Sequence, residues 1–316
     1  MTDSNPNSDS LDPQTNLSEG NQGPHKSGYI ALIGKPNVGK STLINALMGQ
    51  KMSIVTRKPQ TTRHRVLGIL SGDDFQAILL DTPGVLEPKY KLHSAMMRNV
   101  KSAIEDADFI LLLVDVRDKP EDIINLDVIK GKPVALLINK VDLIAEREAL
   151  PLAQAYAQQY DFAEIVPISA LKGANVSRLK DIMISMLPPG PPFYPKEMIS
   201  EHPVRFFVSE IIREKIFEFY GKEIPYSTQV NITVYEEREG KKDLIDAEIV
   251  IERNSQKGIL IGKGGRALKR VGSAARKDIE AFIDREVFLQ LHVKVREGWR
   301  NRDNLLNSYG YGKEGM

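Results

Sequence analysis

The sequence predicts an α/β domain with a mostly parallel sheet, followed by a smaller α+β domain. Up to about residue 187, apolar runs of strand length alternate with stretches whose apolar residues have helical spacing, which is typical of a parallel sheet with helices on both faces. The segment "LPPGPPFYP" at 187–195 then has five prolines among nine residues. Because neither a helix nor a central strand accepts so many prolines, we expect a domain boundary there.

Composition divides the chain into four segments. Residues 1–27 have no basic start followed by an apolar stretch, so they predict a disordered tail and no secretory signal. The N-terminal domain is expected at 28–187, a semi-rigid proline-rich linker at 188–203, and the C-terminal domain with its tail at 204–316. The longest apolar run, "FILLLV" at 109–114, is too short to cross a bilayer.

The chain has no cysteine and a net charge of +1. The absence of cysteine excludes disulfides and thiolate metal sites, and together with the missing secretory signal it favours a cytoplasmic protein. A net charge so close to zero does not by itself indicate a nucleic-acid partner. Any basic surface must therefore be local.

The expected elements follow in chain order. Five apolar runs predict the strands of the first sheet: "YIALIG" (29–34), "FQAILLD" (75–81), "FILLLVDV" (109–116), "PVALLINK" (133–140) and "EIVPIS" (164–169). Three segments between and after them predict helices: "KSTLINALMG", "LHSAMMRNVKSAIEDA" and "NVSRLKDIMISML". The second domain is expected to begin with the helix "FFVSEIIREKIFEFYG", followed by the strands "TQVNITVYEER" and "LIDAEIVIER", helical turns around "GKGG", a long helix and the strand "FLQLHVKV".

The segment "GKPNVGKS" at 34–41 has the spacing of a phosphate-binding P-loop. Gly34, Gly39, Lys40 and Ser41 match its fixed positions, and the motif follows a predicted strand and opens a predicted helix, as the P-loop requires. Successive backbone N–H groups would then wrap the phosphates of a nucleotide. Lys40 would reach the β- and γ-phosphates, and Ser41 would bind Mg²⁺ at the positive end of the helix.

Three further motifs end predicted strands of the same sheet. "DTPG" begins with Asp81, a carboxylate that could hold the Mg²⁺ through water. "NKVD" ends with Asp142, which can accept hydrogen bonds from N1–H and the exocyclic amine of guanine, so this motif selects GTP. "SALK" could point the backbone N–H of Ala170 at the guanine O6. All three lie where a parallel sheet binds ligands, at the carboxyl ends of its strands.

These four elements, in this order, resemble the translation-factor-related family of GTPases. "KPQTTRH" at 58–64 is similar to the first switch of that family, in which a threonine closes over Mg²⁺. The pattern Pro-x-x-Thr-Arg falls on Pro59, Thr62 and Arg63, which favours Thr62 as that threonine and leaves Thr61 as the alternative.

The resemblance implies that magnesium is held by Ser41, Thr62 and, through water, Asp81. It also implies a larger set of nucleotide contacts. These are Gly34, Pro36, Asn37, Val38, Gly39, Lys40, Ser41, Thr42, Thr62, Asp81, Thr82, Pro83, Gly84, Asn139, Lys140, Asp142, Ser169, Ala170 and Leu171.

The hydrolytic residues differ from those of small Ras-like GTPases. Val85 stands where those proteins have a glutamine that orients the attacking water, so we expect a slow intrinsic rate. The backbone N–H of Gly84 can still contact the γ-phosphate, beside Lys40 and Thr62. In related GTPases that lack the glutamine, an asparagine at the position of Asn37 helps to hold K⁺ beside the phosphates. The resemblance therefore implies K⁺ as a second ion.

The segment "ILIGKGGRALKRVG" fits the pattern of a KH domain, Ile-Gly-x-x-Gly-x-x-aliphatic. KH domains use this glycine turn to bring an RNA backbone close to main-chain atoms. From 256 to 276 the chain has six basic residues and no acidic one, so the expected local basic surface coincides with the turn. The candidate RNA contacts are Lys257, Ile261, Gly262, Lys263, Gly264, Gly265, Arg266, Lys269 and Arg270. Ile249, Ile259 and Ile261 are expected in the core or in the groove under the bases.

A GTPase domain followed by a type II KH domain, the bacterial arrangement of the KH elements, resembles the Era family of GTPases. The resemblance spans about residues 28–310 and includes "QTTRHRVLGI", "SEIIREKI" and "VKVREGW". It implies a GTP-hydrolysing switch that binds GTP and GDP, binds small-subunit ribosomal RNA near its 3′ end and assists maturation of the 30S subunit. It also implies peripheral contact with the inner face of the membrane, and we expect a monomer.

Two alternatives stay open at this point. A GTPase of tRNA modification, or one with tandem GTPase domains, would share the first 187 residues, but the "GKGG" turn argues against both. An RNA-binding scaffold that keeps a nucleotide without hydrolysing it would fit Val85.

Overall fold

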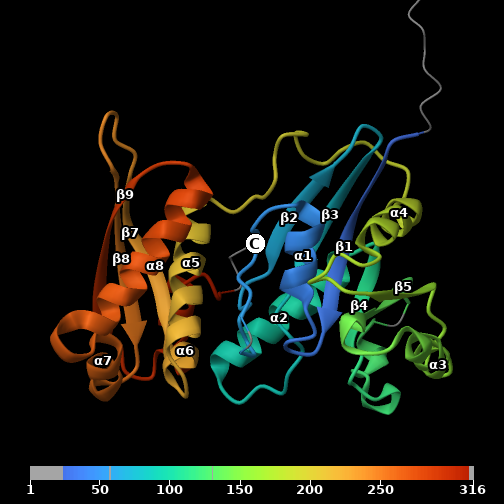
Figure 1. Ribbon diagram of the computed structural model, residues 1–316, viewed down its shortest axis with the longest axis horizontal. Coiled ribbons are helices and arrows are strands. Elements are labelled where there is room, and N and C mark those ends of the chain that lie inside the picture. The colour runs from blue at the N-terminus through green and yellow to red at the C-terminus, as the bar shows by residue number, and fades with distance from the viewer. Residues whose placement is uncertain (1–23, 57, 130, 313–316) are drawn as a thin grey trace, which may run out of the picture.

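The computed structural model describes residues 24–56, 58–129 and 131–312, which form two domains (Figure 1). Most of the predicted N-terminal tail lies outside these residues. Its last two positions were assigned wrongly, because Lys26 and Ser27 begin strand β1 (Lys26–Gly34) and pair with Phe75 and Gln76. The N-terminal domain therefore starts two residues earlier than predicted.

The first sheet has six strands in the order β2-β3-β1-β4-β5-β6. The five predicted strands are β1, β3 (Phe75–Asp81), β4 (Phe109–Asp115), β5 (Val134–Asn139) and β6 (Glu164–Ile168), and they run parallel. The sequence pattern did not identify β2 (Val66–Ser71), which pairs antiparallel with β3 at the edge. The predicted mostly parallel α/β fold is confirmed.

Helices cover both faces of this sheet. α1 (Lys40–Met48) and α4 (Val176–Met186) share one apolar core with the sheet, while α2 (Lys91–Asp106) and α3 (Glu146–Ala157) share the other. The sequence pattern predicted all of these except α3, which has a proline in its interior. Three short 3₁₀ turns complete the domain at Pro120–Asp122, Leu126–Ile129 and Val141–Leu143.

The linker is attached to the N-terminal domain along most of its length. The Gln76 side chain accepts hydrogen bonds from the backbone N–H groups of Phe193 and Tyr194 and donates to the Tyr194 carbonyl. Farther along, Ile69 N donates to the Ile199 carbonyl at 2.9 Å. The linker is thus a strap across β3 and β2. Its predicted limits of 188 and 203 lie between the end of α4 at Met186 and the start of α5 at Val204.

The C-terminal domain has the expected element order. Its elements are α5 (Val204–Phe219), α6 (Ile224–Ser227), β7 (Gln229–Glu236), β8 (Asp243–Ile251), α7 (Asn254–Ile261), a 3₁₀ turn (Lys263–Gly265), α8 (Arg266–Ile283) and β9 (Val287–Val295). β8 pairs antiparallel with β7 and parallel with β9. α5, α7 and α8 share an apolar core with this sheet, and α5 lies on the side that faces the N-terminal domain (Figure 1).

Most of the predicted C-terminal tail is folded. A 3₁₀ turn (Trp299–Asn301) and α9 (Asp303–Ser308) pack against α2 of the other domain. Trp299 is fully buried and donates its Nε1–H to the Ser227 carbonyl at 2.9 Å, within an apolar cluster that includes Met96 and Tyr311. The domains are therefore joined by a packed interface as well as by the linker.

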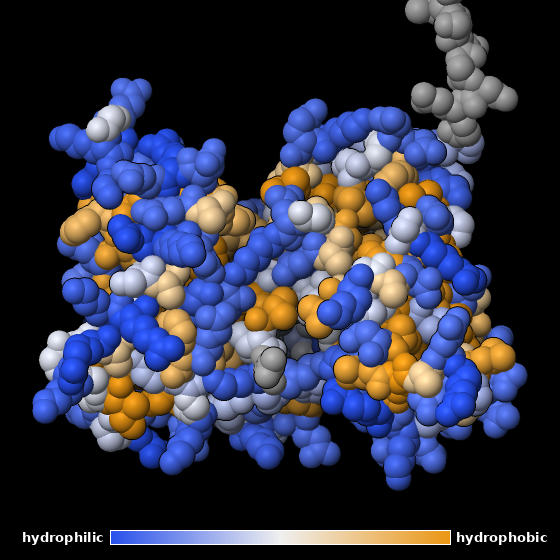
Figure 2. All heavy atoms as spheres, viewed as in Figure 1, coloured by the Kyte–Doolittle hydropathy of each residue, from blue (hydrophilic) through white to orange (hydrophobic). Residues whose placement is uncertain are grey.

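The surface view shows two lobes with a hollow between them at one end, and hydrophobic residues appear as separate patches on both lobes (Figure 2). Within the described residues, no helix is long and apolar enough to span a membrane.

The interface around Trp299 gives a first prediction. Met96→Ala should lower the free energy of unfolding by about 2–5 kcal/mol, because it leaves a cavity between two packed elements; Met96 is 1% exposed. Urea unfolding followed by circular dichroism measures this loss. Trp299 is the only tryptophan in the chain, so its fluorescence emission reports solvent entry at the same place. Leu150→Ala, at an exposed position of α3, is the control, and equal midpoints for the two variants would contradict the prediction.

Candidate functional site: a nucleotide cleft and a basic glycine turn

The P-loop motif joins β1 to α1 and is shaped by close contacts. A Cβ atom at Gly39 would lie 2.2 Å from Nδ2 of Asn139, and Gly39 has a φ of +106°. No side chain fits this position because both the space and the backbone conformation exclude it. Asn139 uses the room to donate from Nδ2 to the Val38 carbonyl at 2.7 Å. The "NKVD" motif therefore braces the P-loop directly.

The Lys40 ammonium group lies inside the loop. Its Nζ donates to the carbonyls of Gly34 at 3.0 Å and Lys35 at 3.1 Å. Burial lowers the pKa of Lys40 to about 8, although the neighbouring Asp81 opposes this shift. A nucleotide phosphate at the loop would supply the negative charge that keeps this lysine protonated.

Three oxygen-bearing side chains meet at the start of α1. Ser41 Oγ lies 2.8 Å from Thr62 Oγ1 and donates to Asp81 Oδ2 at 2.9 Å. The Thr61 hydroxyl points elsewhere, donating to the Lys58 carbonyl at 2.8 Å. Burial raises the pKa of Asp81, while Lys40 lowers it. Two hydroxyls and a carboxylate are ligands that suit Mg²⁺, so this cluster fits the predicted ion, and the geometry favours Thr62 over Thr61.

The opposite end of the cleft contains the residues assigned to guanine. The Ser169 hydroxyl donates to Asp142, and the side chains of Leu143 and Leu171 are exposed beside it, as expected for apolar walls around a base. The Ala170 N–H, which we assigned to guanine O6, donates to Asn139 Oδ1 at 2.9 Å. A guanine oxygen would have to share or replace that acceptor.

Lys140 makes two contacts that the motif alone did not predict. Its Nζ contacts Asp115 Oδ2 at 2.6 Å and the Asn37 carbonyl at 2.7 Å, while Arg117 donates from Nε to Asp115 Oδ1 at 2.8 Å. Burial alone would raise the pKa of Asp115, but hydrogen bonds from Arg117 and Lys140 hold it well below its usual range. We missed Asp115, although it ends an apolar strand in the same way as Asp81.

The end of the "DTPG" motif packs directly on the P-loop. A Cβ atom at Gly84 would lie 2.6 Å from Pro36 N, so this position also requires glycine. Val85 donates its N–H to the Gly34 carbonyl at 3.1 Å, and its side chain packs against the apolar core. That side chain offers no group to orient water, as the sequence indicated.

The remaining candidates either line the cleft or support it. The cleft has a volume of about 790 Å³, and its walls include Pro36, Asn37, Thr42, Thr62, Gly84 and Arg117. Val38 and Thr82 are buried behind it; Val38 belongs to the core, and the Thr82 hydroxyl donates to the Leu32 carbonyl at 2.6 Å. Pro83 is buried as well.

The "GKGG" turn is the basic feature of the C-terminal domain. Gly262, Gly264 and Gly265 have φ values of +70°, +60° and +75°, conformations that side chains rarely adopt. Lys263 is exposed and, within the described part of the chain, forms no ion pair. Beside the turn, a groove of about 380 Å³ lies between α8 and β9; its walls are Gly265, Leu268, Lys269, Gly272, Ser273, Arg276, Leu289 and Leu291.

The other predicted RNA contacts have different surroundings. Arg266 donates to the Lys263 carbonyl at 3.3 Å, and Lys257 and Ile261 are half-buried. The guanidinium of Arg270 lies 4.2 Å from the ring centre of Phe219. Because it packs on this residue of α5, Arg270 is a weaker candidate for RNA contact than Lys269. Ile249 belongs to the core, whereas the side chain of Ile259 is 58% exposed.

Comparisons with known proteins agree with this geometry. Residues 29–140 match the family model of 50S ribosome-binding GTPases, and residues 223–300 match the KH domain model. The chain is 50% identical to "GTPase ERA-like, chloroplastic" of Arabidopsis thaliana over 295 residues, which cover 91% of this chain and 69% of that protein. It is also 50% identical to "GTPase ERA1, chloroplastic" of Zea mays, in a match that covers 92% of this chain and 71% of that protein.

Two solved structures share the whole two-domain arrangement. One is a variant of Aquifex aeolicus Era bound to GDP and AlF₄⁻, with a TM-score of 0.87 at 41% identity, covering 91% of this chain and 99% of that one. The other is Era in complex with MgGDPNP and nucleotides 1506–1542 of 16S ribosomal RNA, with the same score, identity and coverage. By its sequence, its nucleotide cleft and its KH domain, the chain belongs to the Era family of GTPases.

Proposed function

We propose that this protein is a GTP-hydrolysing switch that binds small-subunit ribosomal RNA near its 3′ end and assists maturation of the 30S subunit. The observation that carries the GTPase part is the meeting of Ser41, Thr62 and Asp81 at the P-loop. Those residues come from α1, the first switch and β3, so the metal site joins the elements that surround the γ-phosphate. The solved Era complex with MgGDPNP and 16S ribosomal RNA supports the same assignment.

Each part of the cleft has a distinct role in the proposed reaction. The P-loop N–H groups and Lys40 bind the phosphates, and Asp142 with the two leucine walls binds guanine. Mg²⁺ would neutralise charge on the β- and γ-phosphates. The backbone N–H of Gly84 would contact the γ-phosphate, and the apolar Val85 leaves water orientation to the backbone. This arrangement supports slow intrinsic hydrolysis.

The RNA-binding part rests on the turn and its groove. Backbone at positive φ with open space around Gly264 and Gly265 allows a phosphate backbone to approach closely. Lys263 and Lys269 are exposed at this approach, and Leu268 and Leu289 provide an apolar surface for bases. The cytoplasmic location, the peripheral membrane contact and the monomeric state are parts of this proposal that rest on the resemblance or on composition.

Asp142→Asn should shift nucleotide preference from GTP toward xanthosine triphosphate. The substitution replaces an acceptor with a donor, so the guanine N1–H and amine lose their partner. Titration with fluorescent analogues of both nucleotides measures the change, and Asp181→Asn on the exposed face of α4 is the control. Unchanged GTP affinity would refute the role of Asp142.

Hydrolysis should be faster in KCl than in NaCl at equal ionic strength if K⁺ adds positive charge beside the phosphates. Asn37→Gly should remove the difference, because glycine keeps access to the φ of +65° at this position but lacks the carboxamide. Single-turnover hydrolysis in the two salts tests this. Equal rates for the wild type would leave Asn37 a loop-shaping residue, and no hydrolysis in either salt would favour the non-catalytic scaffold.

Replacing Lys263 and Gly264 together with Asp should abolish RNA binding, since it adds bulk and negative charge where the phosphates approach. GTP affinity should stay within about twofold, a difference of about 0.4 kcal/mol, because both substituted residues lie in the C-terminal domain and outside the lining of the nucleotide cleft. A filter-binding assay at fixed salt measures RNA affinity.

The chain offers a matched control for that variant. Gly240 also has a positive φ, +66°, with open space around it, and Lys241 follows it, so replacing both with Asp makes the same chemical change on the β7–β8 loop. Equal losses of RNA affinity in the two double variants would show a general charge effect and would count against the KH assignment.

A further inference from the structure

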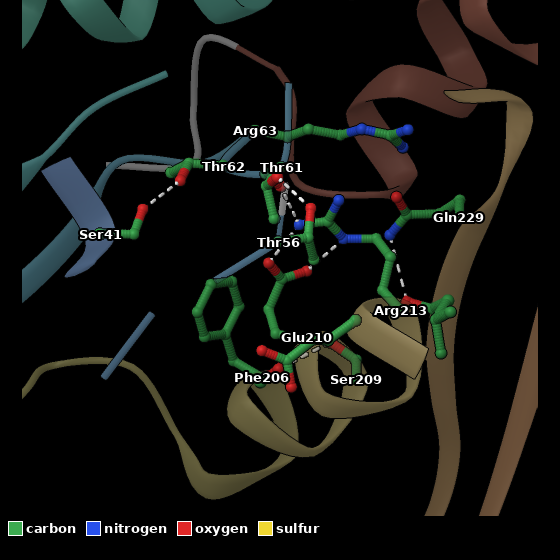
Figure 3. Close-up of polar contacts among 12 residues, drawn as sticks. Ser41, Thr56, Thr61, Thr62, Arg63, Phe206, Ser209, Glu210, Arg213 and Gln229 are labelled. Carbon is green, nitrogen blue, oxygen red and sulfur yellow. Dashed lines mark hydrogen bonds and ion pairs between the residues drawn. The ribbon is translucent and has the colours of Figure 1, made fainter. Parts of the chain in front are cut away.

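Helix α5 of the KH domain contacts the first switch beside its magnesium-binding threonine. The guanidinium of Arg213 donates from Nη2 to the Thr61 carbonyl and forms an ion pair with Glu210 one turn earlier. Figure 3 shows Arg213 pointing from α5 toward the backbone of Thr61, while the Thr62 hydroxyl turns to Ser41 on the other side. A KH-domain side chain thus holds the peptide unit that joins Thr61 to Thr62.

The residue that follows Thr62 is held by the same domain. Arg63 is 2% exposed, and its side chain enters the KH domain. Its Nη1 donates to the Thr228 carbonyl at 2.6 Å, and its Nη2 donates to the carbonyls of Pro225 and Tyr226 at 3.0 Å. Contacts with the KH domain therefore lie on both sides of Thr62 in the chain, and they limit how far its hydroxyl can move from Ser41.

The position of Arg213 makes its contact with Thr61 difficult to replace. The residue is 1% exposed, and among the described residues its Nη1 has no hydrogen-bond partner. Burial alone would lower the pKa of Arg213, but Glu210 more than offsets this, so the pair is ionised. If the Thr61 carbonyl moved away, a buried guanidinium that already has an unused donor would lose another acceptor, which is costly. The docked KH domain therefore opposes displacement of the first switch.

We propose that Arg213 is a positioning residue for GTP hydrolysis: by holding the Thr61 carbonyl it keeps Thr62 beside Ser41 and Asp81, so that full activity requires the KH domain to be docked. This inference rests on the proposed role of Thr62 as the magnesium-binding threonine. In this role Arg213 contacts neither nucleotide nor metal and acts only through the first switch.

The test is a double-mutant cycle between Arg213 and Thr62 in the full-length protein. Arg213→Met keeps the aliphatic stem and removes the donors, and Arg213→Lys restores one of them. Single-turnover GTP hydrolysis should slow by about tenfold to a hundredfold in Arg213→Met, the effect expected for a lost hydrogen bond to a charged group, and recover in part in Arg213→Lys. GDP affinity should stay unchanged, because GDP has no γ-phosphate and the first-switch threonine closes over Mg²⁺ when the γ-phosphate is present.

The cycle separates positioning from a structural role. Adding Arg213→Met to Thr62→Ala should slow hydrolysis no further, since Arg213 acts through Thr62. Fully additive losses, or a drop in GDP affinity that matches the drop in rate, would overturn the inference. If Arg213→Met lowers the thermal midpoint too far to assay, the same cycle with Arg213→Lys, which keeps the buried charge, decides the question.

Two further results distinguish this inference from the proposed function. If Thr62→Ala hydrolyses GTP like the wild type, the assignment of Thr62 is wrong and the inference falls with it. If Thr62→Ala is slow but Arg213→Met is normal, only the inference is wrong. Arg285→Lys is the matched control, because Arg285 contacts the buried Asp243 in the same domain and not the first switch. Its hydrolysis rate should equal that of the wild type.

Discussion

Two buried arginines, one from each domain, cross the interface in opposite directions and determine how the first switch lies. Arg63 donates to backbone carbonyls of the KH domain, and Arg213 donates to a backbone carbonyl of the first switch. Both guanidinium groups lie near the ring of Phe217, at 6.0 and 5.3 Å from its centre. Because a buried guanidinium is stable only with its partners in place, neither arginine can be withdrawn without leaving the other domain's groups unpaired. The arrangement of the domains and the shape of the proposed metal site therefore depend on the same contacts.

The nucleotide cleft could be predicted from the sequence because its motifs are local and each follows a strand. A parallel sheet brings the ends of its strands to one edge, so "GKPNVGKS", "DTPG", "NKVD" and "SALK" had to meet. The glycines of these motifs are needed for contacts between them: Gly39 makes room for Asn139, and Gly84 makes room for Pro36. The choice of Thr62 over Thr61 came from a family pattern, and the hydroxyl positions agree with it.

The interdomain contacts could not be predicted in this way, because their hydrogen bonds join residues 152 to 213 positions apart. Arg213 belongs to "SEIIREKI", a charged run that is typical of a solvated helix face, yet here it is buried against the first switch. The C-terminal segment was predicted to be a tail, but Trp299 and Tyr311 fix it on α2. Ala170 is a similar case, since a motif identifies the N–H group but not the side chain that competes for it. In each case the deciding partner lies on an element distant in sequence.

The chemistry of the contacts around Thr62 bears on whether they can be reversed. They consist of guanidinium groups and backbone carbonyls, which exchange their partners for water at little net cost when both sides become solvated. An apolar contact of the same size would favour one permanent arrangement. α5 also joins the first switch to the proposed RNA-binding surface. Lys215 of α5 contacts Asp278 of α8 at 2.7 Å, and α8 begins at the glycine turn. If RNA at the turn changed the affinity for GTP at the P-loop by some factor, GTP would change the affinity for RNA by the same factor, because such coupling is reciprocal. Arg213 and Lys215 both lie on α5, so this helix is the route by which the proposed RNA and GTP sites would influence each other.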